Sequence, residues 1–113
     1  MIIQITASEF NGQVTASTVP VLIEFFSDHC FHCQQLLPIL AEIAAERPDS
    51  LRIFKFDAGA DPRFAAQFRI KAVPNLVLFR AGEPIAQRSG FSAKRPLLAW
   101  IDSATDVAES DLI

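Results

Sequence analysis

Residues 21–40 read VLIEFFSDHCFHCQQLLPIL and contain both cysteines of the chain, Cys30 and Cys33. The apolar run over residues 19–26 is broken only by Glu24. Such a run is typical of a strand that is buried on both faces in a parallel or mixed sheet. After the cysteines, apolar residues recur at helical spacing, at Leu36, Leu37, Leu40, Ile43 and Ala44. The sequence therefore predicts a buried strand that turns into a helix at the two cysteines.

The position of the cysteines at a predicted helix start indicates redox chemistry. Two thiols separated by two residues lie one helical turn apart on the same face, close enough to form a disulfide. The thiol of Cys30 lies at the positive end of the helix dipole, which favours its thiolate. We therefore predict a reversible dithiol/disulfide pair. The Cys30 thiolate attacks a substrate disulfide, and the less exposed Cys33 resolves the mixed disulfide.

Length and composition restrict the classes of protein that fit. At 113 residues, half of them apolar, the chain predicts a single domain over residues 1–113, with a frayed tail at 108–113. The net charge of −3 gives no electrostatic basis for binding nucleic acid or an anionic membrane. We find no run of about 20 apolar residues and no signal peptide. Two cysteines are too few for a secreted disulfide scaffold, so we expect a cytoplasmic protein without a bound cofactor.

The rest of the chain alternates predicted strands and helices, which implies an α/β fold with a mixed central sheet flanked by helices on both faces. Four further strands are predicted, at residues 2–6, 51–57, 75–79 and 84–88, of which the last two form a hairpin. Three further helices are predicted, one that begins with Ser8 as its N-cap and two at residues 61–70 and 92–107. Gly90 indicates a bulge or a close backbone approach.

Features spaced from Phe10 to about Ile101 resemble the thioredoxin family. Besides the strand before Cys30, they are Pro38, Lys55-Phe56-Asp57, Val73-Pro74-Asn75, Gly82-Glu83 and Gly90. The resemblance implies the thioredoxin fold and a thiol-disulfide oxidoreductase. Its partners would be disulfide-containing or dithiol proteins. Its electrons would be exchanged with an NADPH-dependent flavoprotein reductase or with glutathione.

Glu24 is a charged residue in the middle of the buried strand. Burial raises the pKa of a carboxyl group, which suits a proton acceptor near neutral pH. The family resemblance implies that Glu24, where an aspartate is usual, lies beneath Cys33 and takes the proton of that thiol. It also implies that Lys55, on the adjacent strand, is the partner of Glu24. The alternative is a buried ion pair without a kinetic role.

The resemblance also implies the substrate-binding residues that face the cysteines. Pro74 would follow a cis peptide bond, which sequence alone does not indicate because few X–Pro bonds are cis. The backbone of Val73 would then be available to pair with an extended substrate segment. Asn75, where threonine is usual, and Gly90 complete this expected set.

Three residues beside the cysteines depart from the family pattern, in which tryptophan precedes the first cysteine and Gly-Pro separates the two. His32 either stabilises the Cys30 thiolate or faces solvent with little effect. In the first case the disulfide is more oxidising than the roughly −270 mV of thioredoxin, at about −170 to −250 mV. His29 either adds positive charge or is a passive surface residue. Phe31 either offers an exposed apolar contact to protein substrates or folds back onto the domain.

Two rival functions use the same residues. A chaperone or an assembly or binding module with little redox turnover is compatible with the loss of the tryptophan and Gly-Pro. A metal site formed by His29, Cys30, His32 and Cys33 is disfavoured, because ligands packed into five consecutive residues point in different directions on a helix. We therefore expect no bound metal.

Overall fold

The computed structural model describes residues 2–110, with side chains described through residue 105. Five strands form one mixed sheet in the order β1-β3-β2-β4-β5. They are β1 (Ile3–Gln4), β2 (Val21–Phe26), β3 (Arg52–Asp57), β4 (Asn75–Arg80) and β5 (Glu83–Ser89). The central strand β2 pairs in parallel with β3 and antiparallel with β4. This arrangement confirms the predicted α/β fold with a mixed sheet.

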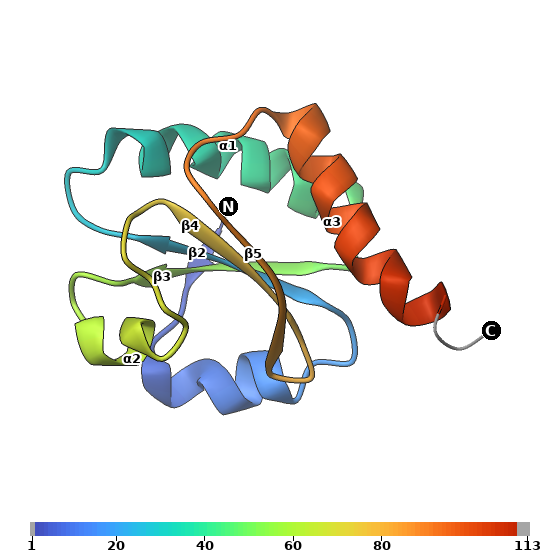
Figure 1. Cartoon of the computed structure of the whole chain (residues 1–113), viewed down its shortest axis with the longest axis horizontal. Coiled ribbons are helices and arrows are strands. Elements are labelled where there is room, and N and C mark those ends of the chain that lie inside the picture. The colour runs from blue at the N-terminus through green and yellow to red at the C-terminus, as the bar shows by residue number, and fades with distance from the viewer. Residues whose placement is uncertain (1, 111–113) are drawn as a thin grey trace.

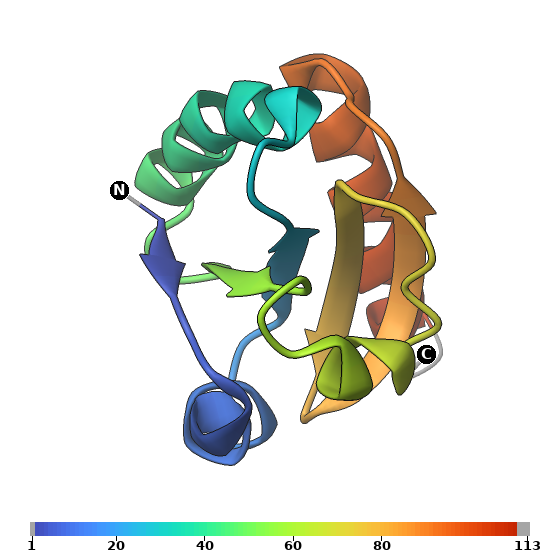
Figure 2. The same cartoon turned by 90° about the vertical axis from the view of Figure 1, so that its left-hand side faces the viewer.

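Helices cover both faces of the sheet, as predicted (Figure 1). In Figure 2, α1 (Phe31–Glu46) lies at the top, and α3 (Lys94–Ser110) begins at the top right and runs down behind β5. The helical turns η1 (Ala7–Glu9) and η2 (Asn11–Thr15) lie at the bottom with α2 (Pro62–Ala66). Successive side chains of β2 point to opposite faces of the sheet, so its nearly continuous apolar run makes both sheet faces apolar. Leu22 belongs to the core beneath α1 and α3, whereas Ile23 belongs to the core on the opposite face.

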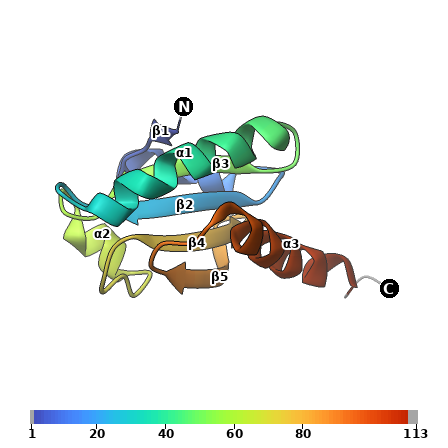
Figure 3. The same cartoon turned by 90° about the horizontal axis from the view of Figure 1, so that it is seen from above.

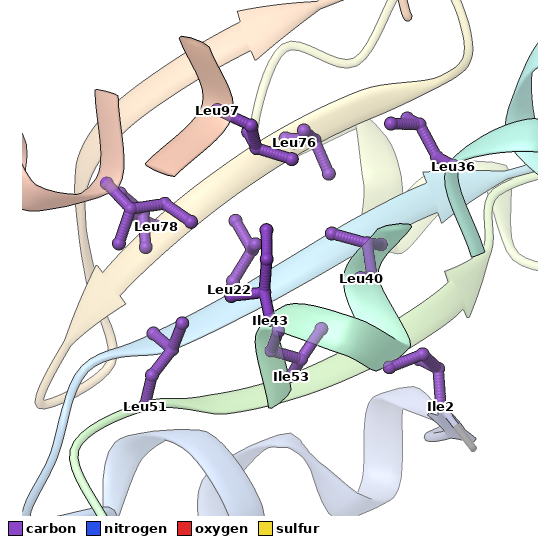
Figure 4. Packing of buried hydrophobic residues seen from close by; sticks show 11 residues of the cluster. Ile2, Leu22, Leu36, Leu40, Ile43, Leu51, Ile53, Leu76, Leu78 and Leu97 are labelled. Carbon is purple, nitrogen blue, oxygen red and sulfur yellow. The ribbon is translucent and has the colours of Figure 1, made fainter. Parts of the chain in front are cut away.

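The two cores differ in composition. Beneath α1 and α3 the core is aliphatic, and Figure 4 shows Leu36 and Leu40 of α1 and Leu97 of α3 meeting Leu22 and Leu76 of the sheet. On the opposite face the core is aromatic, with ring centroids 4.8–5.9 Å apart among Phe10, Phe25, Phe56, Phe64, Phe68 and Phe79. These ring contacts hold the short helices against the sheet, because their few residues bury little area alone.

The helices α1 and α3 are also joined by charged side chains. Seen from above, α1 lies towards β3 and α3 towards β4 (Figure 3). Arg47, the C-cap of α1, forms a two-pronged ion pair with Asp102 of α3. Lys94 at the start of α3 pairs with Glu42 at 3.2 Å and with Glu46. These partly exposed pairs link the C-terminal end of α1 to the first half of α3.

Several predicted boundaries were wrong. The N-cap of η1 is Thr6 and not Ser8, because Glu9 reaches back and its Oε1 accepts the backbone N–H of Thr6 at 2.8 Å. The edge strand predicted at residues 2–6 is shorter, because β1 covers only Ile3–Gln4. The helix predicted at residues 61–70 is also shorter, because α2 ends at Ala66. The helix α3 ends at Ser110, and residues 111–113 lie outside the described part, so the frayed tail expected at residues 108–113 stays a prediction.

The interpretation of Gly90 as a bulge was also wrong, whereas its backbone does approach another segment closely, because its N–H donates to the carbonyl of Pro74 at 2.9 Å. A Cβ atom at Gly90 would meet nothing within 4 Å, and the residue instead adopts a φ of 89° after β5. The bulge lies between β4 and β5, where Leu78 pairs with Ala86 but Phe79 pairs with Pro84. Gly90 therefore serves the turn out of β5 through its positive φ.

The β4–β5 hairpin supplies a test of backbone conformation. Its turn residues Ala81 and Gly82 have φ values of 53° and 85°, and a Cβ atom on Gly82 would lie 2.6 Å from Oγ1 of Thr15. We expect Gly82→Ala to lower the free energy of unfolding by about 1–3 kcal/mol, through backbone strain and this contact. Urea unfolding measures the loss.

Gly90→Ala is the matched control, because its φ is also positive but the added methyl group meets no neighbour. We expect this variant to lose less stability than Gly82→Ala. Equal losses at the two positions would show that the contact between the hairpin and Thr15 contributes nothing.

Candidate active site

The two cysteines are joined as a disulfide at the start of α1, with their Cα atoms 5.2 Å apart. Cys30 is the N-cap of the helix, and its Sγ accepts the backbone N–H of Cys33 at 3.2 Å. Cys33 is 3% exposed, whereas Cys30 is partly exposed. Cys30 is therefore the more accessible of the two cysteines, and it lies at a helix N-terminus, a position that stabilises a thiolate.

Glu24 lies on β2 on the same face as Leu22, and its side chain is fully buried. Among the described residues, neither carboxyl oxygen has a hydrogen-bond partner. Burial raises the pKa of Glu24 to about 8, although the charge of Lys55 partly lowers it. The carboxyl group therefore holds its proton more tightly than an exposed carboxyl group does.

Lys55 lies on β3 in register with Glu24, on the adjacent strand as expected. It forms no hydrogen bond with Glu24 in the described structure. Its Nζ instead lies 5.5 Å from the ring centroid of Phe26. The lysine therefore influences the carboxyl group through its charge and without a direct bond.

A cavity of about 220 Å³ joins these groups. Glu24, Cys33 and Lys55 all line it, together with Asp28 and His29. The remaining lining comes from Phe26, Ser27, Gln34 and Leu37. The buried carboxyl group, the inner cysteine and the lysine thus line one space that is large enough to hold water.

The Val73–Pro74 peptide bond is cis, in agreement with the expectation. Asn75 begins β4 opposite Phe25, so this segment lies at the end of the sheet where β2 leads to the cysteines (Figure 1). The backbone N–H of Gly90 donates to the carbonyl of Pro74 at 2.9 Å. Asn75 is buried, and its Oδ1 accepts a hydrogen bond from Gln87 at 3.0 Å, so its side chain is engaged within the protein.

Exposed rings surround the disulfide. Phe31 is 66% exposed, which excludes the alternative that it folds back onto the domain. The exposed His32 ring donates from Nδ1 to Oε1 of Gln35 at 2.9 Å. Phe91, 44% exposed, lies with its ring 6.3 Å from that of His32. Sequence reasoning missed Phe91, although a phenylalanine directly after Gly90, outside any predicted strand, was the available signal.

His29 occupies an unusual backbone position. It is exposed, and its φ of 65° lies in the left-handed region, which few residues other than glycine adopt. The same residue lines the cavity of Glu24 and Cys33. His29 is therefore exposed to solvent and also lines the cavity that Glu24 lines.

Comparisons with known proteins agree with this geometry. The thioredoxin family model matches residues 1–103. The chain is 37% identical to a thioredoxin of Acidithiobacillus ferridurans over 102 residues, covering 90% of this chain and 94% of the relative. It is 31% identical to a thioredoxin of Rickettsia prowazekii over 104 residues, covering 92% and 99%. The chain belongs to the thioredoxin family, and with its Cys30–Cys33 pair it is a thiol-disulfide oxidoreductase.

A third relative joins two activities in one chain. The bifunctional thioredoxin reductase/thioredoxin of Mycobacterium leprae is 33% identical over 96 residues, which cover 85% of this chain and 21% of the relative. Within the described part of the present chain, no group of three or more histidine, cysteine or acidic residues is placed to hold a metal ion. None of the described helices is long and apolar enough to cross a membrane.

Proposed function

We propose that this protein exchanges disulfides with protein substrates and is a stronger oxidant than an ordinary thioredoxin. The observation that carries the proposal is the position of His32 in the first turn of α1, between the two cysteines. An imidazolium ion at this position stabilises the Cys30 thiolate and hence the dithiol form. A more stable dithiol form makes the disulfide a better electron acceptor.

In the proposed reaction, the Cys30 thiolate attacks one sulfur of a substrate disulfide and releases the other as a thiolate. Cys33 then gives its proton to the Glu24 carboxylate and attacks the sulfur of Cys30. The Cys30–Cys33 disulfide forms, and the substrate leaves as a thiolate that takes a proton from water. The charge of Lys55 favours the ionised form of Glu24. The same steps in reverse oxidise a substrate dithiol.

The exposed rings and the cis proline supply the proposed substrate surface. Phe31 lies beside the nucleophile with most of its surface exposed, which suits an apolar side chain of a protein substrate. The backbone of Val73, before the cis bond, is proposed to pair with an extended segment of that substrate. Pro74, Asn75 and Gly90 hold this segment at the end of the sheet.

The recycling partner is proposed to be an NADPH-dependent flavoprotein reductase or glutathione. The relative from Mycobacterium leprae, whose name joins a thioredoxin reductase to a thioredoxin, supports the first of these. We propose the cytoplasm as the place of action, because a chain with only two cysteines relies on no structural disulfide framework.

The reduction potential tests the role of His32. Equilibration with glutathione buffers at about pH 7 is expected to give about −170 to −250 mV. His32→Asn should lower this potential by about 30 mV for each unit by which the pKa of the Cys30 thiol rises. A wild-type value below about −250 mV would place the protein among reducing thioredoxins and refute the proposal.

A further inference from the structure

We propose that His29 carries protons between the buried carboxyl group of Glu24 and solvent, through the cavity that both residues line. This inference rests on the proposed function, in which Glu24 accepts the proton of Cys33. His29 does not touch the reacting sulfurs in this proposal. It acts through Glu24, which is mostly protonated near pH 7 and must be returned to its ionised form before it can take the proton of Cys33.

The side chain of Glu24 is shielded from solvent, and it borders a cavity that other titratable side chains also line. Its side chain is fully buried, and no described residue forms a hydrogen bond with either oxygen. The cavity of about 220 Å³ exceeds the roughly 30 Å³ that a water molecule occupies. The other titratable groups that line it are Asp28, His29, Cys33 and Lys55. This cavity is therefore a route by which a proton can leave Glu24.

Of the side-chain types in the cavity lining, imidazole is the one that readily takes and gives up protons near neutral pH. An ammonium group is too weak an acid for this exchange, and an ordinary carboxylate is too weak a base. His29 is exposed while it lines the cavity, so it can exchange protons with bulk water. Its left-handed backbone, at a φ of 65°, belongs to the turn between β2 and Cys30.

The rate at which Glu24 can release its proton to water explains why a relay would be useful. The pKa of Glu24 is raised to about 8 by burial. Proton capture at a diffusion limit of about 10¹⁰ M⁻¹ s⁻¹ implies that such an acid releases its proton to water at only about 100 s⁻¹. Enzyme turnover commonly lies between about 1 and 1,000 s⁻¹. Unassisted proton release from Glu24 would therefore fall within the range of turnover rates, and a nearby base removes this limit.

The proton balance of the step is simple. The Cys33 thiol passes its proton to the Glu24 carboxylate as its sulfur attacks Cys30 and displaces the substrate thiolate. Protonated Glu24 then gives the proton, through water in the cavity, to neutral His29. The imidazolium ion releases it to bulk solvent. The electron pair moves only among the sulfurs, and the substrate disulfide is the oxidant of the dithiol.

A small aromatic disulfide, dithiobis(nitrobenzoate), separates the two thiol steps in a stopped-flow experiment. The attack of Cys30 releases one coloured nitrothiobenzoate ion, and the attack of Cys33 releases the second. In dilute buffer near pH 7, we expect His29→Asn to leave the first release unchanged and to slow the second about tenfold. Asparagine tolerates a positive φ, so the turn is preserved.

Rescue by a small base distinguishes a relay from a structural role. His29→Gly also keeps the turn, and added imidazole should restore its second release in proportion to the imidazole concentration. The wild-type protein should show no such dependence. Asp28→Asn, which removes the other acidic group at the cavity lining, is the matched control and should leave both releases unchanged.

The outcomes separate the relay from the function on which it rests. An unchanged second release in His29→Asn, or a slow second release that imidazole does not restore, overturns the relay. Equal slowing of both releases would assign His29 to substrate contact and also overturn it. Loss of the first release from the wild-type protein would instead refute the proposed function.

Discussion

Replacement of Cys30 by serine is expected to abolish thiol-disulfide exchange, with a loss of at least roughly 1,000-fold in the rate of reduction of a disulfide-linked fluorescent peptide. Cys30 is the partly exposed cysteine at the helix N-terminus, and a serine hydroxyl there cannot supply a comparable nucleophile. The buried Cys33 that remains is shielded from protein substrates.

Cys33→Ser is the matched variant, because it changes the same atom one helical turn away. We expect it to keep the first attack and to lose the second, so that a mixed disulfide with the substrate accumulates and appears on a non-reducing gel. Suppression of aggregation by Cys30→Ser at the wild-type level would favour the rival chaperone function. If Cys30→Ser retained most of the exchange activity, the assignment of Cys30 as the nucleophile would be wrong.

Replacement of Glu24 by leucine is expected to make the protein more stable at alkaline pH. Folding raises the pKa of Glu24 from 4.5 to about 8, because burial disfavours the charged form. The folded protein therefore binds this proton more tightly than the unfolded chain does. The cost of ionising the buried carboxyl group is absent below about pH 4.5, and it grows as the pH rises from 4.5 to 8.

Above about pH 8 this cost reaches about 5 kcal/mol, because each unit of the rise in pKa from 4.5 to about 8 contributes 1.36 kcal/mol. Glu24→Leu removes it and adds apolar area to the aliphatic core. We therefore expect the stability of the variant relative to wild type to increase by several kcal/mol between about pH 5 and pH 9. Urea unfolding of both oxidised proteins at these two pH values measures the difference.

Glu24→Gln is the control for shape and polarity. It also removes the titration, but a buried amide without partners costs about 1–3 kcal/mol, so this variant should be less stable than Glu24→Leu at both pH values. A difference between wild type and Glu24→Leu that stays constant with pH would contradict the buried-carboxyl account. Both variants should slow the second release of nitrothiobenzoate, because neither side chain accepts a proton from Cys33.

The central strand and the helix after the cysteines could be predicted from sequence because their signals are local and strong. The buried strand lies over residues 21–26 within the predicted run, and α1 begins directly after Cys30. Helix ends were less predictable, because they depend on individual side-chain contacts. The cap at Thr6 depends on where the carboxylate of Glu9 reaches.

The site was predictable where strand neighbours determine it. A charged residue in an apolar strand predicted the burial of Glu24, and the family resemblance placed Lys55 on the next strand. The contact of Lys55 with Phe26 was not predictable, because a long side chain chooses among several neighbours. The position of His29 on the cavity depends on a left-handed backbone, which the sequence does not specify for histidine.

The two edges of the sheet affect how the protein behaves at high concentration. One edge is the two-residue strand β1, and the other is β5, which contains Pro84 and adjoins the bulge at Leu78 and Phe79. Proline offers no backbone N–H, and a bulge twists a strand away from flat pairing. A second molecule thus finds only two residues of strand at one edge and, at the other, a strand whose first part is interrupted by Pro84 and the bulge. This chain is therefore protected against edge-to-edge aggregation by its backbone, independently of its redox state.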